Sequence, residues 1–370
     1  MGMGMGIRGT ALVTSAVAAS LLLAGCSSAG DDAGTATTAA PSASSDSPSA
    51  SPSSPAPSSP APSSAAPSES PSDDLPAVTE PVSLPALMRD EVIGADLELG
   101  EVIGRYGAYT KYAVSYRADD LTITGIMNVS AGDGPFPVVV LLHGHIDPAI
   151  YVSGQGYRRE QDALARNGYV AFHVDYRNHA GSDDDPRNDV DLRLGYARDT
   201  IAAVEAVKAS DLPFLDGERI GLIGRSMGGQ VAFNALVARP GLVDAAVTYA
   251  SVSTDAVDNY ERWIRFADGR RQLAAAIERE HGSPEDDPEF WAGVSARNYF
   301  DQITTPVMVH HGVVDDTCPI AWSRATVRAL RAADVDVTYH EYPGENHYMY
   351  AGWAPSFQRT LAFLEKNLTA

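Results

Sequence analysis

The chain is poor in cysteine and in positive charge. Its 370 residues include two Cys and 27 basic against 48 acidic residues, which gives a formal net charge of −21. Proteins that bind a phosphate backbone present basic stripes, and this sequence has none, so we exclude nucleic acid as a partner. The excess of acidic residues is typical of a solvated surface.

Motifs for phosphate and for metal ions are scarce as well. No G-x-x-x-x-G-K segment occurs, and no G-x-G-x-x-G opens a helix after the first strand. His143 and His145 could form a metal pair, but no further His/Asp cluster follows at ligand spacing. The acidic run 183–185 could bind a cation or form a solvated loop, and we favour the loop. We expect neither a metal nor a cofactor.

Residues 27–72 lack Lys, Arg, aromatic residues, Leu, Ile and Val, and consist mainly of Ser, Ala and Pro. Such a composition cannot bury enough apolar surface to offset the entropy of ordering. We therefore predict a disordered linker over residues 26–80, followed by a folded domain over residues 81–370.

The first residues are typical of an export signal. Arg8 precedes an apolar run over residues 11–24, and the run ends in Leu23-Ala24-Gly25-Cys26. This pattern resembles a bacterial lipoprotein signal, which predicts a signal peptide over residues 1–25 and lipid on Cys26. The protein would then be exported and anchored to the outer face of the bacterial cytoplasmic membrane. The alternative is an ordinary secretory signal with an accidental Cys. With Cys26 lipidated, Cys318 has no partner for an internal disulfide.

The folded part alternates between strand and helix patterns. Apolar and β-branched runs predict eight strands, at residues 109–116, 121–129, 136–142, 169–176, 219–223, 245–252, 306–310 and 335–342. Helical periodicity lies between the later runs, at residues 157–167, 192–210, 226–238, 320–333 and 355–368. The first two strands should form an antiparallel hairpin. The rest predict an α/β fold with a mostly parallel eight-stranded sheet and helices on both faces.

One segment interrupts the alternation. Residues 253–302 are rich in aromatic and charged residues and are too long for a plain connection. We interpret this segment as a small helical cap over the functional site, the alternative being an extra packing helix elsewhere. Tyr151, Tyr157, Trp263 and Trp291 could line the pocket under it or belong to the core.

A nucleophile motif stands where a strand turns into a helix. Gly224-Arg225-Ser226-Met227-Gly228 fits G-x-S-x-G, and it follows the strand at residues 219–223 and opens a helix. The turn is so tight that side chains at both glycines would clash. Ser226 at its apex would expose its hydroxyl at a helix N-terminus, where negative charge is favoured. The alternative is a serine that only caps the helix.

A serine hydroxyl needs a base, and the base needs an orienting carboxylate. In this motif's fold the partners follow in the order Ser, acid, His. Asp315 follows the strand that ends at His310, with Asp316 as its rival, and His347 follows the last strand. The backbone N–H groups of Met227 and His145 are the expected donors to the oxyanion.

Together these segments resemble the catalytic domain of the prolyl oligopeptidase family of alpha/beta-hydrolases. The marks are Gly-Tyr-Val at residues 168–170, Asp-Tyr-Arg at 175–177, Gly-Arg-Ser-Met-Gly-Gly at 224–229, His-Gly-Val-Val-Asp-Asp at 311–316 and Pro-Gly-Glu-Asn-His at 343–347. The similarity runs from about Tyr157 to Leu368. In acylaminoacyl-peptidase-like members of this family, a His-Gly-Gly loop supplies an oxyanion amide, and His143-Gly144-His145 stands in its place.

The resemblance implies a serine hydrolase with the triad Ser226, Asp315 and His347, acting on a peptide or small ester through an acyl-enzyme. The larger peptidases of the family carry an N-terminal β-propeller, for which the segment before His143 leaves no room. A carboxylesterase or dienelactone-hydrolase-like esterase is therefore the alternative to a peptidase. A non-catalytic binding protein usually lacks a triad member, and all three are present here.

Overall fold

We describe residues 75–368 in a computed structural model of the chain. The predicted signal peptide, the lipidation site Cys26 and most of the predicted linker lie outside the described residues. Arg89 donates hydrogen bonds to the carbonyl oxygens of Leu75 and Pro76, and Leu75 packs against the core. Contacts with the domain thus begin ahead of residue 81. Within residues 75–368, no helix has the length and apolar character needed to cross a membrane.

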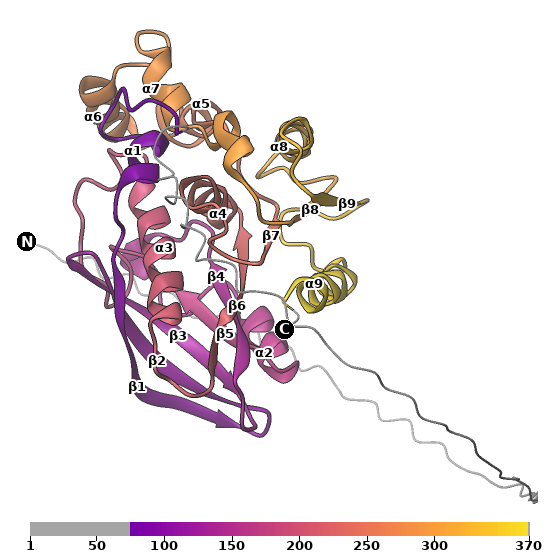
Figure 1. Ribbon diagram of the computed structural model, residues 1–370. Helices are drawn as coiled ribbons and strands as arrows, with labels where there is room; N and C mark the ends of the chain where they lie inside the picture. The colour runs from indigo at the N-terminus through magenta and orange to yellow at the C-terminus, as the bar shows by residue number, and fades with distance from the viewer. Residues whose placement is uncertain (1–74, 369–370) are drawn as a thin grey trace, which may run out of the picture. The chain divides into compact units, whose positions relative to one another are not determined.

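One mixed sheet organises this part of the chain (Figure 1). The strands run in the order β1-β2-β3-β5-β4-β6-β7-β8-β9. Strands β1, β2 and β3 are antiparallel, β3 is antiparallel to β5, and the strands from β5 to β9 are mutually parallel. The bounds are β1 Gly94–Tyr106, β2 Tyr109–Ala118, β3 Leu121–Ser130, β4 Phe136–Leu142, β5 Val170–Val174, β6 Leu215–Arg225, β7 Ala245–Tyr249, β8 Val307–Gly312 and β9 Val337–Tyr342.

The predicted fold class is confirmed, and the strand count of eight is corrected to nine. All eight predicted strands are present, and β2 and β3 form the predicted hairpin. The additional strand is β1 at the sheet edge, whose pairing with β2 is interrupted by register shifts after Ala95, Leu99 and Val102. These irregularities break the alternation of apolar and polar residues by which a strand is recognised in a sequence.

Helices cover both faces of the sheet, as predicted. The helical segments are α1 Leu84–Arg89, η1 Pro148–Ile150, α2 Arg158–Arg166, α3 Leu194–Lys208, α4 Met227–Ala238, α5 Ala256–Tyr260, η2 Glu261–Arg265, α6 Arg271–His281, α7 Pro288–Gly293, η3 Ala296–Gln302, α8 Ile320–Ala332 and α9 Trp353–Asn367. Here η1 and η3 are 3-10 helices and η2 is a π-helix.

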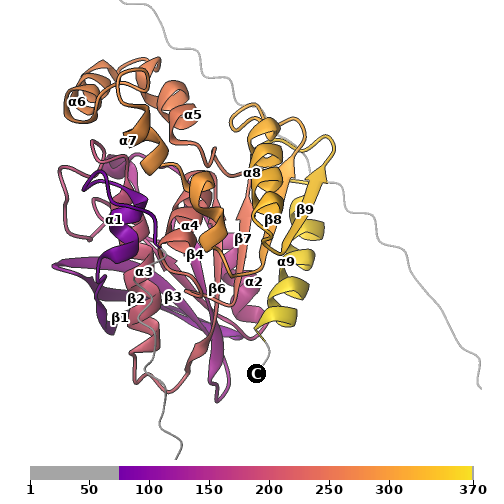
Figure 2. The same cartoon turned by 45° about the horizontal axis from the view of Figure 1, so that its top comes forward.

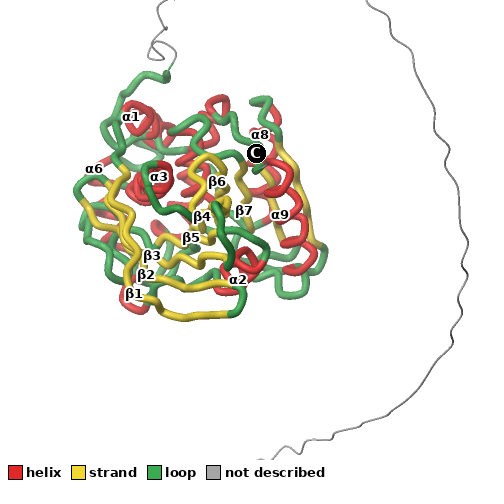
Figure 3. Tube along the Cα trace, turned by 60° about the horizontal axis from the view of Figure 1, so that its bottom comes forward, coloured by secondary structure: helices red, strands yellow, loops and turns green. Residues whose placement is uncertain are grey.

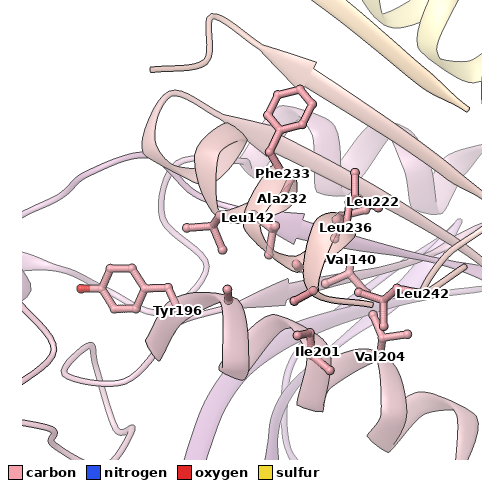
Figure 4. Packing of buried hydrophobic residues seen from close by; sticks show 14 of the residues in the cluster. Val140, Leu142, Tyr196, Ile201, Val204, Leu222, Ala232, Phe233, Leu236 and Leu242 are labelled. Atoms are coloured by element: carbon pink, nitrogen blue, oxygen red, sulfur yellow. The ribbon is translucent and has the colours of Figure 1, made fainter. Parts of the chain in front are cut away.

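The central strand β4 shows why two layers form. Val140 and Leu142 pack on one face with α3 and α4, where Leu222, Ile201 and Phe233 surround them (Figure 4). Val139 and Leu141 belong to a second core with residues of α2 and α9. These two helices lie on the opposite side of the sheet from α3 (Figure 3). Full burial of one such apolar side chain stabilises the fold by about 1.5–3 kcal/mol relative to leaving it exposed. A strand buried on both faces therefore reads as a continuous apolar run.

The segment at residues 253–302 is helical throughout most of its length. It leaves the sheet after β7, forms α5, η2, α6, α7 and η3, and returns to the sheet at β8. Helices α5, α6 and α7 lie together at the top of the views in Figures 1 and 2. We call residues 253–302 the cap.

Candidate active site

Ser226 occupies a strained turn between β6 and α4. Its backbone angles are φ 55° and ψ −121°, a conformation that side chains other than glycine rarely adopt. Its N–H donates to the carbonyl of Tyr249, and its own carbonyl accepts from the N–H groups of Gly229 and Val252. These bonds hold the residue at the turn that the sequence predicts for a nucleophile.

Two glycines make this turn possible. A Cβ at Gly224 would lie 2.2 Å from the carbonyl oxygen of Gly228, and a Cβ at Gly228 would lie 2.0 Å from the carbonyl oxygen of Leu142. Both are backbone atoms, which cannot move aside as a side chain can. The N-terminus of α4 is thereby pressed against the ends of β4 and β6.

Asp315 and His347 form a hydrogen-bonded pair. His347 Nδ1 lies 2.8 Å from Asp315 Oδ2, and both side chains are largely buried. The loops after β8 and β9 bring them together, because the N–H of Val314 donates to the carbonyl of Glu345. Gly312 permits this approach, since a Cβ there would lie 2.3 Å from that same carbonyl oxygen.

The Asp315 carboxylate is held in its ionised form. Burial by itself would raise its pKa, but hydrogen bonds from His311, His347 and the backbone N–H of Cys318 outweigh burial and hold the pKa well below its usual value. The N–H groups of Thr317 and Cys318 both donate to Oδ1, at 2.9 and 2.8 Å. Oδ2 is thus left to face the histidine.

The rival acid Asp316 does not take this position. Its side chain is exposed and accepts only a long hydrogen bond from the Thr317 hydroxyl, at 3.4 Å. It does not cap the following helix either, because α8 begins after Pro319 without a side-chain cap.

A cavity of about 540 Å³ joins these groups. Ser226 and His347 both line it. Thr317 lines it as well, and belongs to the loop after β8 that carries Asp315, which we call the acid loop. The cap supplies Tyr260 and Trp263 to its wall, so the cap forms part of the wall of the site. Of the four aromatic residues considered from the sequence, Trp263 lines this cavity, whereas Tyr151, Tyr157 and Trp291 are buried elsewhere.

The loop after β4 lies against Ser226. A Cβ at Gly144 would be 3.1 Å from the Cβ of Ser226, and Gly144, His145 and Met227 all line the cavity. In the part of the chain that the structure describes, no backbone hydrogen bond uses the N–H of His145 or Met227. Both amides are therefore available to a ligand oxygen in the cavity.

The two histidines of this loop do not form a metal pair. The ring nitrogens of His143 lie 2.7 Å from the Gly144 carbonyl and 3.1 Å from the Asp175 carbonyl, and the ring stacks on Tyr151. Among residues 75–368 no group of three or more His, Cys, Asp or Glu residues is arranged to hold a metal ion. In the acidic run, Asp183 accepts from the N–H of Thr122, and Asp185 pairs with Arg177.

Sequence reasoning missed two residues that contact this machinery. The thiol of Cys318 reaches the Ser226 hydroxyl, and Arg262 of the cap donates to the carbonyls of Asp316 and Thr317. Neither residue belongs to a recognisable motif. The proximity of Cys318 to Asp315 along the chain was the only available signal for it.

Comparison with protein families gives a match over residues 155–370, to the model described as the prolyl oligopeptidase family. Among curated relatives, the chain is 28% identical over 222 residues to the uncharacterised peptidase YuxL of Bacillus subtilis strain 168. It is also 28% identical over 230 residues to dipeptidyl aminopeptidase BIII of Pseudoxanthomonas mexicana. These alignments cover 58% and 60% of this chain, but only 31% of each relative.

Among solved structures, acetyl xylan esterase 1 from Thermoanaerobacterium sp. JW/SL YS485 has the same fold. The TM-score is 0.56 at 16% sequence identity, and the match covers 77% of this chain and 92% of the esterase. Structural similarity at this level of sequence identity shows the fold but does not identify the substrate.

Proposed function

Since the chain belongs to the prolyl oligopeptidase family, we propose that it is a serine hydrolase whose catalytic triad is Ser226, Asp315 and His347. The observation that carries this proposal is the 2.8 Å contact of His347 with Asp315, because His347 also lines the cavity that contains Ser226 at its strained turn. The proposed substrate is a peptide or a small ester, cleaved through an acyl-enzyme.

In the first half-reaction, Ser226 Oγ attacks the acyl carbonyl carbon while His347 takes the hydroxyl proton. Asp315 orients the imidazole and stabilises its charged form. The oxyanion accepts hydrogen bonds from the N–H groups of Met227 and His145, and removing one such donor costs on the order of a hundredfold in rate. The leaving group departs with the proton from His347.

In the second half-reaction, water replaces the leaving group. His347 takes a proton from the water as its oxygen attacks the acyl carbon, and the proton then passes to Ser226 Oγ as the ester bond breaks. The acid product leaves, and the starting enzyme is restored.

A peptidase is our first candidate, because the family and both curated relatives are peptidases by name. A carboxylesterase is the second, since an acetyl xylan esterase shares this fold, so the fold leaves the choice between peptide and ester open. A peptide library assayed beside 4-nitrophenyl esters separates the two. Cleavage of short esters alone would rule out the peptidase.

The nucleophile is tested with a fluorophosphonate probe. We expect labelling of the wild-type protein and none of Ser226→Ala, with Ser251→Ala as a matched control that keeps labelling. Ser251 is a buried serine near the turn whose hydroxyl bonds to the Val252 carbonyl. Equal labelling of wild type and Ser226→Ala would overturn the assignment.

We also propose that the protein is exported and carries lipid on Cys26, which would hold it at the outer face of the bacterial cytoplasmic membrane. The support is the sequence ahead of the folded domain, where an apolar run ends in Leu-Ala-Gly-Cys. A lipid anchor would place the cavity in the extracytoplasmic space, with substrates drawn from outside the cytoplasm.

A further inference from the structure

The cavity is rich in arginine although the chain as a whole is strongly acidic. Arg193, Arg225 and Arg270 line it, against Asp189 as its one carboxylate. The positive charge of Arg225 is balanced by an ion pair, because its Nη2 lies 3.0 Å from Oε1 of the buried Glu160. The charge that a ligand meets is therefore set by Arg193, Arg270 and Asp189.

Arg193 is fixed beside the proposed oxyanion site. Its Nε donates to Asp189 Oδ1 at 2.7 Å, and its Nη1 lies 3.4 Å from the sulfur of Met227, the residue after Ser226. Leu192 and Arg193 both have positive φ, 52° and 62°, directly before α3 begins. Two consecutive strained residues that point into a cavity are more typical of a functional site than of a plain connection.

Arg270 approaches the same end of the cavity from the cap. Among residues 75–368, its side chain has no ion pair or hydrogen bond. It acts together with Arg193 on two neighbours. Burial is the main cause that lowers the pKa of His145 to about 4, and both guanidinium groups lower it further. Both also help to lower the pKa of Asp189, against the effect of burial.

These charges leave one unit of positive charge at this end of the cavity. Arg193 is paired with Asp189, whereas among residues 75–368 Arg270 has no carboxylate in direct contact and is partly withdrawn from water. In such surroundings a cation attracts an anion more strongly than on an open surface. A guanidinium group also fits the two oxygens of a carboxylate. Apolar side chains, among them Ile146, Val252 and Ile264, form the neighbouring wall.

We propose that Arg270, with Arg193 beside it, binds a carboxylate of the substrate, so that the enzyme acts on acyl compounds that carry one free carboxylate and an apolar body. This inference rests on the proposed function, because it takes Ser226 as the reacting centre in the same cavity. An ester of a dicarboxylic acid and a short peptide with a free C-terminus both have this chemistry.

The test compares esters that differ only by methylation of the carboxylate. Mono-4-nitrophenyl adipate and its methyl ester place the charge on the acyl side, and 4-acetoxybenzoate and its methyl ester place it on the leaving group. The preference is the kcat/KM of the anion divided by that of the methyl ester. We expect wild type to prefer the anion in at least one pair, and Arg270→Gln to lower that preference about tenfold, mainly through KM.

Arg271→Gln is the matched control, because it removes an adjacent but exposed guanidinium group that does not line the cavity. It should leave the preference within about twofold of wild type. Arg270→Lys, which keeps the charge without the planar fork, should retain part of the preference. An unchanged preference in Arg270→Gln, or an equal loss in Arg271→Gln, would overturn the carboxylate site.

A binding measurement separates this site from the triad. Calorimetry with 4-phenylbutyrate and the Ser226→Ala protein requires no turnover, and adding Arg270→Gln should weaken binding about tenfold. Binding that depends on Arg270, together with hydrolase activity that is absent from wild type or unchanged in Ser226→Ala, would keep the carboxylate site and reject the proposed triad. Activity that depends on Ser226, with binding and preference indifferent to Arg270, would keep the triad and reject the carboxylate site.

Discussion

The hydroxyl oxygen of Ser226 lies 3.9 Å from the sulfur of Cys318, and the backbone N–H of Cys318 donates to Asp315 at 2.8 Å. One residue therefore touches both the proposed nucleophile and the proposed acid. Its carbonyl oxygen is in turn 2.9 Å from His311 Nε2. The acid loop is thus tied to the serine by a side chain that has no role in the proton transfer.

The Cys318 thiol should be inert in the folded protein. Burial, reinforced by the charge of Asp315, raises its pKa to about 12, so the thiol stays protonated at neutral pH. Its side chain is also fully buried. We expect iodoacetamide at pH 8 to leave Cys318 unmodified until the protein is unfolded, as read by mass spectrometry of the peptide that contains it. Rapid modification of the native protein would contradict this.

Asp315→Asn should lower kcat on the order of 10⁴-fold, because His347 loses the carboxylate that orients it.

The same substitution should change how the stability of the folded protein depends on pH. The pKa of Asp315 is below its usual value in the folded protein, so the ionised carboxylate stabilises the fold above the unfolded pKa, and this contribution is lost as the pH falls towards the folded value. We expect the stability of wild type to fall more steeply than that of Asp315→Asn between about pH 5 and pH 3.

Chemical denaturation at several pH values measures this difference. Asp316→Asn is its control, since that exposed carboxylate does not contact His347. Parallel pH profiles for wild type and Asp315→Asn would contradict the assignment of a depressed pKa.

Gly228→Ala should destabilise the protein by about 1–3 kcal/mol or more and abolish activity, because the added carbon would meet the Leu142 carbonyl. Gly107→Ala is the control, as a Cβ there would have no atom within 4 Å and Gly107 does not have positive φ. Urea unfolding and ester turnover measure both effects. A Gly228→Ala protein with wild-type stability would mean that α4 can move away from β4.

Arg262→Ala should lower kcat about tenfold with a smaller effect on the melting temperature. Arg262 donates to the carbonyls of Asp316 and Thr317 at 2.7 and 2.9 Å and stacks on Trp263 and Trp322, so it fixes the loop that presents Asp315. Arg271→Ala, on the exposed side of the cap, should leave kcat unchanged. Equal kcat values for wild type and Arg262→Ala would show that the loop holds its shape without the cap.

Cys26→Ala should release the protein from the membrane fraction, because the proposed lipid attachment is lost. Fractionation of cells followed by immunoblotting measures this. Ser27→Ala is the control, since it changes the next residue and leaves the thiol. Membrane association of Cys26→Ala equal to that of wild type would contradict the lipid anchor.

The sequence predicted the parts of the fold whose patterns are local. The structure closely matches the apolar runs predicted for β4 to β9 and the periodicity predicted for α2, α3, α4, α8 and α9. A strand that is buried on both faces leaves a continuous apolar run, and a helix that is buried on one face leaves a period of 3.6 residues. Strand β1 was missed because its bulges disturb that signature. The contact between Asp315 and His347 could be expected from their places after β8 and β9.

Other contacts had no local signal. Arg193 precedes α3, whereas Arg262 and Arg270 belong to the cap, and only the folded chain brings the three residues around one cavity and one loop. An arginine in the sequence looks the same whether it faces solvent or a ligand. The contact between Cys318 and Ser226 had no local signal for the same reason, because the two residues are 92 positions apart along the chain.

The cap leaves the sheet after β7 and rejoins it at β8, and these two strands are neighbours in the parallel sheet. An insertion between adjacent strands can be exchanged without changing the connectivity of the rest. Transplanting residues 253–302 from another member of the family would replace Tyr260, Trp263 and Arg270 in one step while leaving Ser226 and His347 on their own loops. The cap therefore carries Arg270, one part of the proposed carboxylate site, on a stretch of chain apart from the proposed triad, which makes it a natural unit for recombination.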